Sequence, residues 1–100
     1  MSKMNYEDRR PVYQNAIALY GAEMQIVVAI EELSELAKEL CKAMRGNVRT
    51  GAICEEIADV AIVIEQLQLI FSTGDGVDSQ MDAKVQRLKE RLQKDFGVQP

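Results

Sequence analysis

Apolar residues recur every three or four positions through most of the chain, which is the spacing of one face of an α-helix. The pattern predicts a short helix from about Pro11 to Tyr20 and three longer ones. The longer helices are expected to cover Ala22 to Arg45, Thr50 to Phe71, and Asp78 or Ser79 to Phe96. A polar segment, residues 1–10, precedes this pattern, and residues 97–100 follow it as a tail. We therefore expect one all-α domain over residues 1–100, with a four-helix-bundle core.

The second predicted helix carries different residues on its two sides. Its apolar positions repeat at three- and four-residue steps, which favours one stripe that faces the core. This stripe consists of Ile26, Ile30, Leu33, Ala37, Leu40 and Met44. Glu32, Glu35 and Glu39 fall on a different face of the same helix.

The third predicted helix is apolar on every side over residues 60–64. A β-strand is the alternative interpretation of this run, since its residues are mostly β-branched. A helix is preferred because no turn signal separates the run from the helical residues around it, and no partner strand occurs elsewhere. A helix that is apolar all round is buried on several faces. In a chain of 100 residues, this predicts burial against a second subunit, and hence a homo-oligomer.

The charge balance and the absence of histidine exclude several classes of function. The chain has 16 acidic residues against 12 basic ones and a net charge of −4, which argues against nucleic-acid binding through phosphate neutralisation. Without histidine, Ser-His-Asp and Cys-His catalysis are excluded, as are zinc sites that contain histidine. A metal would therefore be held by oxygen atoms, which favours Mg²⁺ or Mn²⁺.

The compartment that the sequence predicts is the cytoplasm. Cys41 and Cys54 form no C-x-x-C motif, and we interpret them as free thiols rather than as a structural disulfide. The first residues lack the apolar run of a signal peptide. No run of about 18 apolar residues is present to span a bilayer. We therefore expect no membrane partner.

Two acidic pairs stand out by their spacing: Glu32 with Glu35, and Glu56 with Asp59. Residues three apart lie on nearly the same face of a helix, so two antiparallel helices can bring four carboxylates together. Asp59 starts the most apolar run of the chain, and an ionised carboxylate there is costly unless it is paired with a cation. The cation is either a lysine or arginine from a neighbouring helix, with no function, or a divalent ion shared by the four acids.

The last predicted helix is strongly basic. Its cations are Lys84, Arg87, Lys89, Arg91 and Lys94. They are either a solvated face with surface salt bridges or phosphate-binding residues beside a metal. A polyphosphate requires divalent ions that bridge its oxygens and fixed cations that neutralise the rest.

The two acidic segments resemble the signature of a known family. The run Gln25-Ile-Val-Val-Ala-Ile-Glu31-Glu32-Leu-Ser-Glu35-Leu is followed by Glu55-Glu56-Ile-Ala-Asp59-Val. Together they are similar to the E-x-x-E, spacer, E-x-x-D signature of the all-α nucleoside triphosphate pyrophosphohydrolases, the MazG-like group. Dimeric dUTPases and phosphoribosyl-ATP pyrophosphohydrolases belong to the same superfamily. The resemblance covers roughly residues 11–92 and includes the basic last helix.

The resemblance implies a four-helix-bundle core, an obligate dimer or tetramer, and Mg²⁺-dependent cleavage between the α- and β-phosphates of a nucleotide. The implied metal ligands are Glu32, Glu35, Glu56 and Asp59. Glu31 corresponds to a further acid that holds an extra metal or orients the attacking water, so Glu31 and Glu32 are the implied catalytic residues. The expected substrate contacts are Lys84 and Arg87, then Arg91, Lys38 and Gln25. Gln25 has an alternative interpretation as an exposed polar residue.

Two interpretations without catalysis stay open. The apolar excess of the third helix is also expected of a helical oligomerisation module. A regulatory nucleotide-binding protein would use the same site residues as the enzyme but turn over slowly. The chain has neither tryptophan nor histidine to stack on or read a base, so the sequence leaves the nucleotide open.

Overall fold

The computed structural model describes residues 3–98, and it contains four α-helices. They are α1 (Tyr6–Tyr20), α2 (Ala22–Met44), α3 (Thr50–Phe71) and α4 (Gly74–Phe96). The prediction of an all-α fold is confirmed, since this described part of the chain contains no strand, and residues 60–64 are helical. The ends of α2 and the range of α3 agree with the sequence pattern to within one residue.

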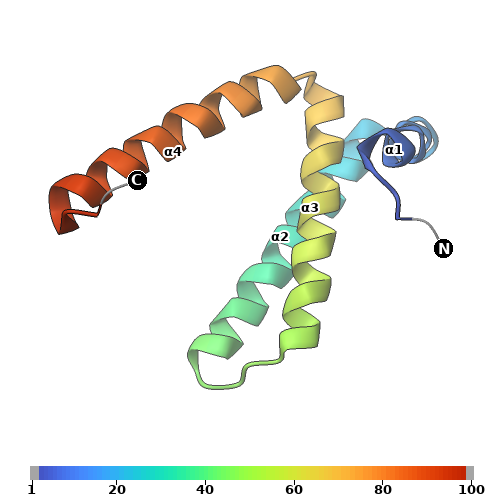
Figure 1. The fold of residues 1–100 in the computed structure, drawn as a ribbon. Coiled ribbons are helices and arrows are strands. Elements are labelled where there is room, and N and C mark those ends of the chain that lie inside the picture. The colour runs from blue at the N-terminus through green and yellow to red at the C-terminus, as the bar shows by residue number, and fades with distance from the viewer. Residues whose placement is uncertain (1–2, 99–100) are drawn as a thin grey trace.

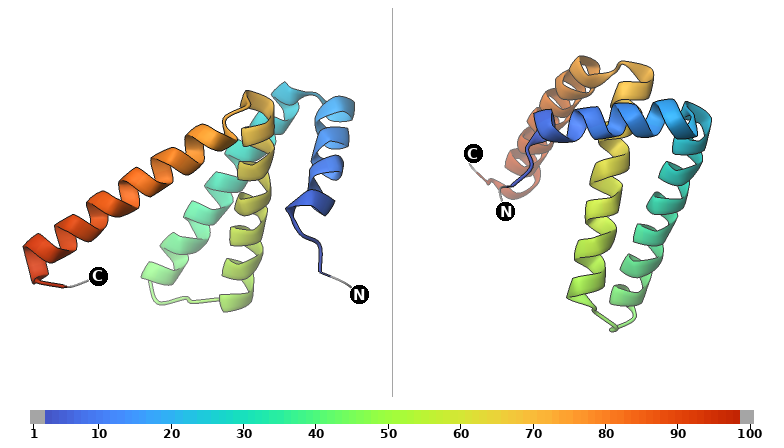
Figure 2. Two further views of the ribbon diagram at one scale, coloured as in Figure 1. Left: turned by 45° about the horizontal axis from the view of Figure 1, so that its top comes forward. Right: turned by 90° about the vertical axis from the view of Figure 1, so that its right-hand side faces the viewer.

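The centre of the fold is an antiparallel hairpin of α2 and α3, joined by a short connection over residues 45–49. α1 crosses the open end of this hairpin, whereas α4 leaves the top of α3 and points away from the other helices (Figures 1 and 2). The radius of gyration is 17.0 Å, compared with about 13 Å for a compact chain of this length. Within a single chain, α4 therefore lies outside the packed part of the fold.

α1 begins at Tyr6, so the prediction that this helix starts near Pro11 was wrong by five residues. The earlier start is explained by a capping box formed by Asn5 and Asp8. The Asn5 side chain accepts a hydrogen bond from the Asp8 backbone N–H at 2.9 Å, and the Asp8 carboxylate accepts one from the Asn5 N–H at 3.0 Å. These bonds satisfy donors at the helix start, and the helix then continues through Pro11.

α4 begins at Gly74, four residues before the predicted cap at Asp78. The glycines at positions 74 and 76 indicated a loop, because glycine disfavours helix interiors. In the structure the break is only Ser72 and Thr73, with Ser72 in the left-handed conformation at φ 53°. The carboxylate of Asp75 lies in the first turn of α4, where a negative charge is favourable.

The prediction that the apolar stripe of α2 faces the core was wrong within the single chain. Ile30, Leu33, Leu40 and Met44 are exposed, by 59%, 46%, 47% and 88%. The buried positions of α2 are instead Gln25, Ala29 and Glu39. The buried apolar residues of the described chain are few: Tyr13, Ala29, Val60 and Val63. The stripe itself therefore points away from the packed part of its own chain.

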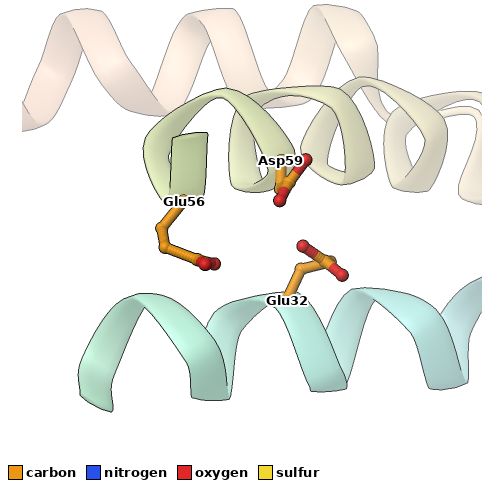
Figure 3. A group of neighbouring side chains, drawn as sticks. All are labelled: Glu32, Glu56 and Asp59. Atoms are coloured by element: carbon orange, nitrogen blue, oxygen red, sulfur yellow. The ribbon is translucent and has the colours of Figure 1, made fainter. Parts of the chain in front are cut away.

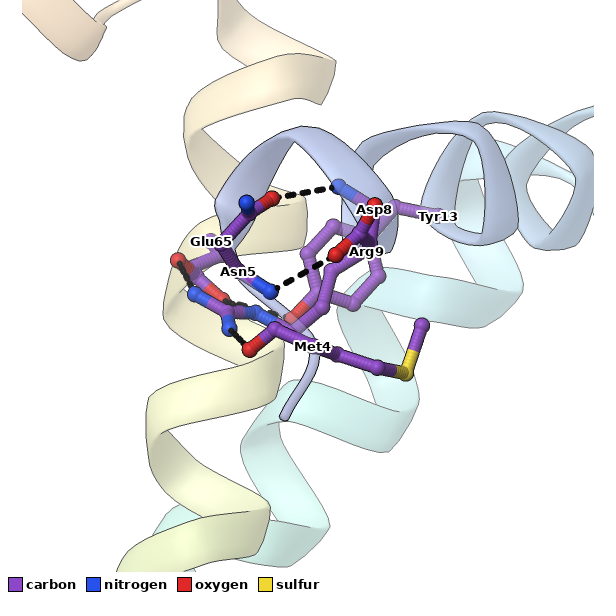
Figure 4. A network of polar contacts seen from close by, with 6 residues as sticks. All are labelled: Met4, Asn5, Asp8, Arg9, Tyr13 and Glu65. Atoms are coloured by element: carbon purple, nitrogen blue, oxygen red, sulfur yellow. Dashed lines mark hydrogen bonds and ion pairs between the residues drawn. The ribbon is translucent and has the colours of Figure 1, made fainter. Parts of the chain in front are cut away.

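A polar network fixes α1 against α3 (Figure 4). Arg9 donates from Nε and Nη2 to the two carboxylate oxygens of Glu65, at 2.9 and 3.0 Å. The Tyr13 hydroxyl donates to Oε1 of the same carboxylate at 2.6 Å, and Arg9 also donates to the Met4 carbonyl at 3.2 Å. Two-pronged contacts of this kind fix orientation as well as distance, so they set where α1 crosses the hairpin.

Cys41 and Cys54 are free, as predicted, and both are exposed. Within residues 3–98, no helix combines the length and the hydropathy that a bilayer crossing requires.

Candidate metal centre

Three carboxylates meet between the two helices of the hairpin. Glu32 comes from α2, and Glu56 and Asp59 come from the facing side of α3. One oxygen atom of each lies within 4.8 Å of the others, and Figure 3 shows the three side chains pointing toward one another. The spacing of three residues between Glu56 and Asp59 puts both on the same part of α3, so the antiparallel pairing brings them to Glu32. We call these three residues the acidic cluster.

The acidic cluster is electrostatically unfavourable without a cation. Burial raises the pKa of Glu32 above its usual value, and a hydrogen bond with Asp59 and the charges of Asp59, Glu56 and Glu35 raise it further. Burial also raises the pKa of Glu56, and nearby carboxylates, first Asp59, add to the effect. Both shifts have the direction expected when like charges are brought together out of water.

One oxygen of the acidic cluster has no hydrogen-bond partner among residues 3–98. Glu56 Oε2 is buried and makes no hydrogen bond to any described residue. The salt bridges of the described chain join Arg9 to Glu65 and both Lys42 and Arg49 to Glu39, so none neutralises the acidic cluster. A buried carboxylate oxygen without a donor is costly, and a bound cation would remove that cost.

The donor set suits a hard divalent cation. Glu32, Glu56 and Asp59 offer only carboxylate oxygens, which is the chemistry preferred by Mg²⁺ and Mn²⁺ rather than by zinc. Each cysteine lies outside the cluster. The residues present therefore fit the kind of metal that the composition predicted.

The remaining acids of the signature lie near the acidic cluster without joining it. Glu35 is exposed and outside the cluster of three, although its charge raises the pKa of both Glu32 and Glu56. Glu31 is exposed on α2, next to Glu32 in sequence. The structure thus brings together three of the four predicted metal ligands.

The predicted substrate residues are spread over two helices. Gln25 is buried, with 7% exposure, which also contradicts its alternative interpretation as an exposed residue. Lys38 is exposed on α2, one turn after Glu35. Lys84, Arg87 and Arg91 are exposed on α4, and α4 approaches α3 but neither α1 nor α2. A single chain therefore does not bring the α4 cations to the acidic cluster.

An ion pair between the buried Glu39 and the exposed Arg49 was not predicted. Glu39 is 5% exposed, and Arg49 donates to its two oxygens from Nε at 3.1 Å and Nη2 at 2.9 Å. Lys42 Nζ lies 3.8 Å from Glu39 Oε2. The Arg49 hydrogen bond lowers the pKa of Glu39, against the opposing effect of burial. The sequence indicated only that Glu39, two helical turns after Glu32, lies on the same side of α2, and it did not identify Arg49 as the partner.

A cavity of about 640 Å³ lies away from these residues, between α1, the end of α3 and the start of α4. Its walls include Tyr6, Arg10, Gln14, Gln68 and Asp75. None of the predicted site residues lines this cavity. It is therefore separate from the acidic cluster and does not form a nucleotide pocket with it.

Comparisons of the chain with protein-family models, with curated proteins and with solved structures gave no match.

Proposed function

We propose that the protein is a Mg²⁺-dependent nucleoside triphosphate pyrophosphohydrolase, which cleaves between the α- and β-phosphates and releases a nucleoside monophosphate and pyrophosphate. The observation that carries the proposal is the acidic cluster, whose three carboxylates lie within 4.8 Å of one another without a basic partner in the described chain. The type of reaction is proposed from the resemblance of the two acidic segments to the MazG-like signature.

In this proposal Glu32, Glu56 and Asp59 hold the metal, and the exposed Glu35 completes the ligand set. Mg²⁺, or Mn²⁺ in its place, would polarise the phosphoryl oxygens and offset the charge that develops on them. Glu31 lies one residue before Glu32 and is exposed to solvent. It orients the attacking water and accepts its proton, which requires no histidine.

The substrate contacts are assigned to cations that have no other partner. Lys84 and Arg87 form no salt bridge within the described chain, and they neutralise the leaving pyrophosphate in an in-line displacement. Arg91 and Lys38 contribute further positive charge. Gln25 is buried, so a contact with the nucleotide requires a movement of its side chain, and it is the weakest of these assignments.

We further propose that the chain works as a homodimer or homotetramer in the cytoplasm. The exposed stripe of α2 is matched by exposed apolar residues two turns apart on α3, Ile57 and Ile64. On each helix, the residues of the apolar stripe follow by one position the residues that face the other helix of the same hairpin. In an antiparallel pair of helices, this offset places both stripes on the same side of the hairpin. Two such hairpins, packed face to face, would form the four-helix bundle that one chain lacks.

The test is a panel of nucleoside triphosphates incubated with the pure protein and Mg²⁺, with pyrophosphate as the detected product. We expect pyrophosphate from at least one nucleotide, with loss of its release in Asp59→Asn and in Glu56→Gln. Glu55→Gln is the matched control, because Glu55 is adjacent to Glu56 but exposed and outside the acidic cluster. No pyrophosphate from any nucleotide, together with no heat of Mg²⁺ or Mn²⁺ binding in calorimetry, contradicts the proposal.

A second candidate function is a helical oligomerisation module without catalysis. The exposed apolar stripe of α2 favours it, since large exposed apolar surfaces mark interaction sites. The two candidates differ in their response to Mg²⁺, because only the enzyme requires the acidic cluster to bind it. Tight nucleotide binding without product over hours would instead indicate a regulatory nucleotide-binding protein.

A further inference from the structure

An ion pair joins the two helices of the α2–α3 hairpin at the end that carries their connection (Figure 1). Arg49 is the N-cap residue of α3. Its side chain reaches back to α2 and donates to both carboxylate oxygens of Glu39, at 3.1 and 2.9 Å. Of the salt bridges formed within residues 3–98, this one alone links α2 to the start of α3. The placement of the first turn of α3 against α2 therefore depends on it.

The ion pair and the acidic cluster share one register of the hairpin. Glu39 lies seven residues after Glu32 on α2, and Arg49 lies seven residues before Glu56 at the start of α3. Seven residues are nearly two helical turns, about 10.5 Å along each axis, and they return a side chain to the same side of its helix. Equal steps in opposite directions keep residues of an antiparallel pair opposite each other. The register that pairs Glu39 with Arg49 is therefore the one that pairs Glu32 with Glu56.

The hairpin is held together by different interactions on the two sides of the acidic cluster. Its buried apolar residues, Ala29, Val60 and Val63, all lie between the cluster and the open end. Between the cluster and the connection, the one buried residue of the described chain is Glu39. The carboxylates of the cluster repel one another and favour separation of α2 from α3. Near the connection, the contact of Glu39 with Arg49 opposes that separation.

We propose that Glu39 and Arg49 are positioning residues of the candidate metal centre, which keep Glu56 opposite Glu32 and so keep the acidic cluster close enough to bind Mg²⁺. The inference rests on the proposed function and deepens it, because it assigns a role in that site to two residues outside the ligand set. A two-pronged contact fixes direction as well as distance, so it limits both the sliding and the rotation of α3 against α2. Replacement of residues that orient metal ligands typically lowers metal affinity by about 10- to 100-fold.

The substitution Arg49→Gln separates positioning from simple electrostatics, because the two effects have opposite signs. Loss of a cation about two turns from the metal would by itself strengthen Mg²⁺ binding, since like charges repel. Loss of the positioning contact should instead weaken Mg²⁺ binding by about tenfold or more. Arg49→Lys keeps the charge but cannot make the two-pronged contact, so it should also bind Mg²⁺ more weakly than wild type.

The experiment measures the dissociation constant of Mg²⁺ by titration calorimetry, at a temperature where circular dichroism shows each variant to be folded. Arg9→Gln is the matched control. Arg9 makes a two-pronged contact of the same kind with Glu65, but it joins α1 rather than α2 to α3. We expect Arg9→Gln to lower the Tm and to leave Mg²⁺ affinity unchanged, whereas Arg49→Gln should lose affinity.

Mg²⁺ affinity in Arg49→Gln that equals or exceeds that of wild type overturns the inference. An equal loss of affinity in Arg9→Gln also overturns it, because the loss then follows from general destabilisation. If Arg49→Gln does not fold, Arg49→Lys decides the question, and wild-type Mg²⁺ affinity in that variant overturns the inference.

Pyrophosphate release from the nucleotide panel is measured on the same proteins. Mg²⁺ binding that weakens in Arg49→Gln but not in Arg9→Gln supports the inference, and the absence of pyrophosphate from any nucleotide then removes only the proposed function. Pyrophosphate release together with unweakened Mg²⁺ binding in Arg49→Gln overturns only the inference. A wild-type protein that binds no Mg²⁺ overturns both.

Discussion

Glu39 lies seven residues after Glu32 on the same side of α2, and of these two carboxylates only Glu39 has a salt-bridge partner within residues 3–98. The hydrogen bond from Arg49 lowers the pKa of Glu39, whereas burial and neighbouring carboxylates raise the pKa of Glu32. The buried carboxylate of Glu39 is therefore paired with a cation, whereas the half-buried carboxylate of Glu32, two turns away, lies among like charges. A structural role alone would be served by a cation at both positions, so this contrast favours a metal at the acidic cluster.

The first prediction concerns stabilisation by Mg²⁺. A ligand that binds only the folded state stabilises it, by about 2.7 kcal/mol at a concentration 100 times its dissociation constant. We expect Mg²⁺ to raise the Tm of the wild-type protein in thermal unfolding followed by circular dichroism. Glu56→Gln should lose this response, and the Glu55→Gln control should keep it. An equal response of Glu56→Gln and wild type would show that Mg²⁺ acts elsewhere.

The second prediction concerns the metal-free protein. The raised pKa of Glu32 means that the native state loses stability as pH rises from the ordinary value of 4.5 through that higher pKa. In EDTA, Glu32→Gln should therefore have a higher Tm than wild type at neutral pH, and the difference should disappear below about pH 4. With saturating Mg²⁺ at neutral pH the order should reverse. A lower Tm for Glu32→Gln in EDTA at neutral pH would contradict the repulsion within the acidic cluster.

The sequence predicted the helices better than it predicted which of their faces are buried. The three- and four-residue periodicity located α2 and α3, because helix formation is a local property of the chain. The same periodicity placed Ile30 and Leu33 in the core, although both are exposed. Periodicity shows that an apolar face must be covered, but it does not show whether the covering surface belongs to the same chain.

The candidate site was predicted in part for a similar reason. The E-x-x-E and E-x-x-D spacings identified Glu32, Glu56 and Asp59, since residues three apart share a helix face and the antiparallel hairpin brings the two faces together. The pairing of Glu39 with Arg49 was missed, because it depends on the path of the connection between α2 and α3. Local spacing does not determine that path.

The third prediction concerns acid stability. The hydrogen bond from Arg9 lowers the pKa of Glu65, and burial opposes it. The contribution of this carboxylate to stability is therefore complete above its ordinary pKa of 4.5 and is lost as pH falls below that value. Glu65→Gln should lower the Tm at neutral pH by on the order of a few degrees, since solvent screens the partly exposed pair. The difference from wild type should shrink on acidification below about pH 4.5.

Glu23→Gln serves as the control for this pH series, because Glu23 is exposed on α2 and forms no salt bridge in the described chain. Its Tm should follow that of the wild type at every pH. A constant difference between Glu65→Gln and wild type across the whole range would mean that the substitution acts through packing rather than through the charge.

The fourth prediction concerns the proposed oligomer. Leu33 is 46% exposed on the apolar stripe of α2, so a charge there should disturb contacts between chains more than those within one. Leu33→Lys is expected to reduce the mass measured by light scattering toward 11.2 kDa, and to lower the Tm at dilute concentration. Leu19→Lys is the control, because Leu19 is 83% exposed on α1, outside that stripe. An unchanged mass for Leu33→Lys would exclude this face as the interface.

The last prediction tests whether two chains build one site, with activity as the measurement. Asp59→Asn removes a proposed metal ligand, and the double variant Lys84→Ala with Arg87→Ala removes the proposed phosphate-binding cations, so each should be inactive alone. Suppose that the cations of α4 serve the acidic cluster of the other chain. A dimer of one Asp59→Asn chain and one double-variant chain then has one complete site, in which the double variant supplies intact acids and the Asp59→Asn chain supplies intact cations. Unfolding and refolding the two together should then restore about one quarter of the wild-type rate, since half the dimers are mixed and each has one complete site. A mixture of Asp59→Asn with Glu32→Gln should recover nothing, because every site lacks an acid. Equal failure of both mixtures would place the cations and the acids of each site on the same chain.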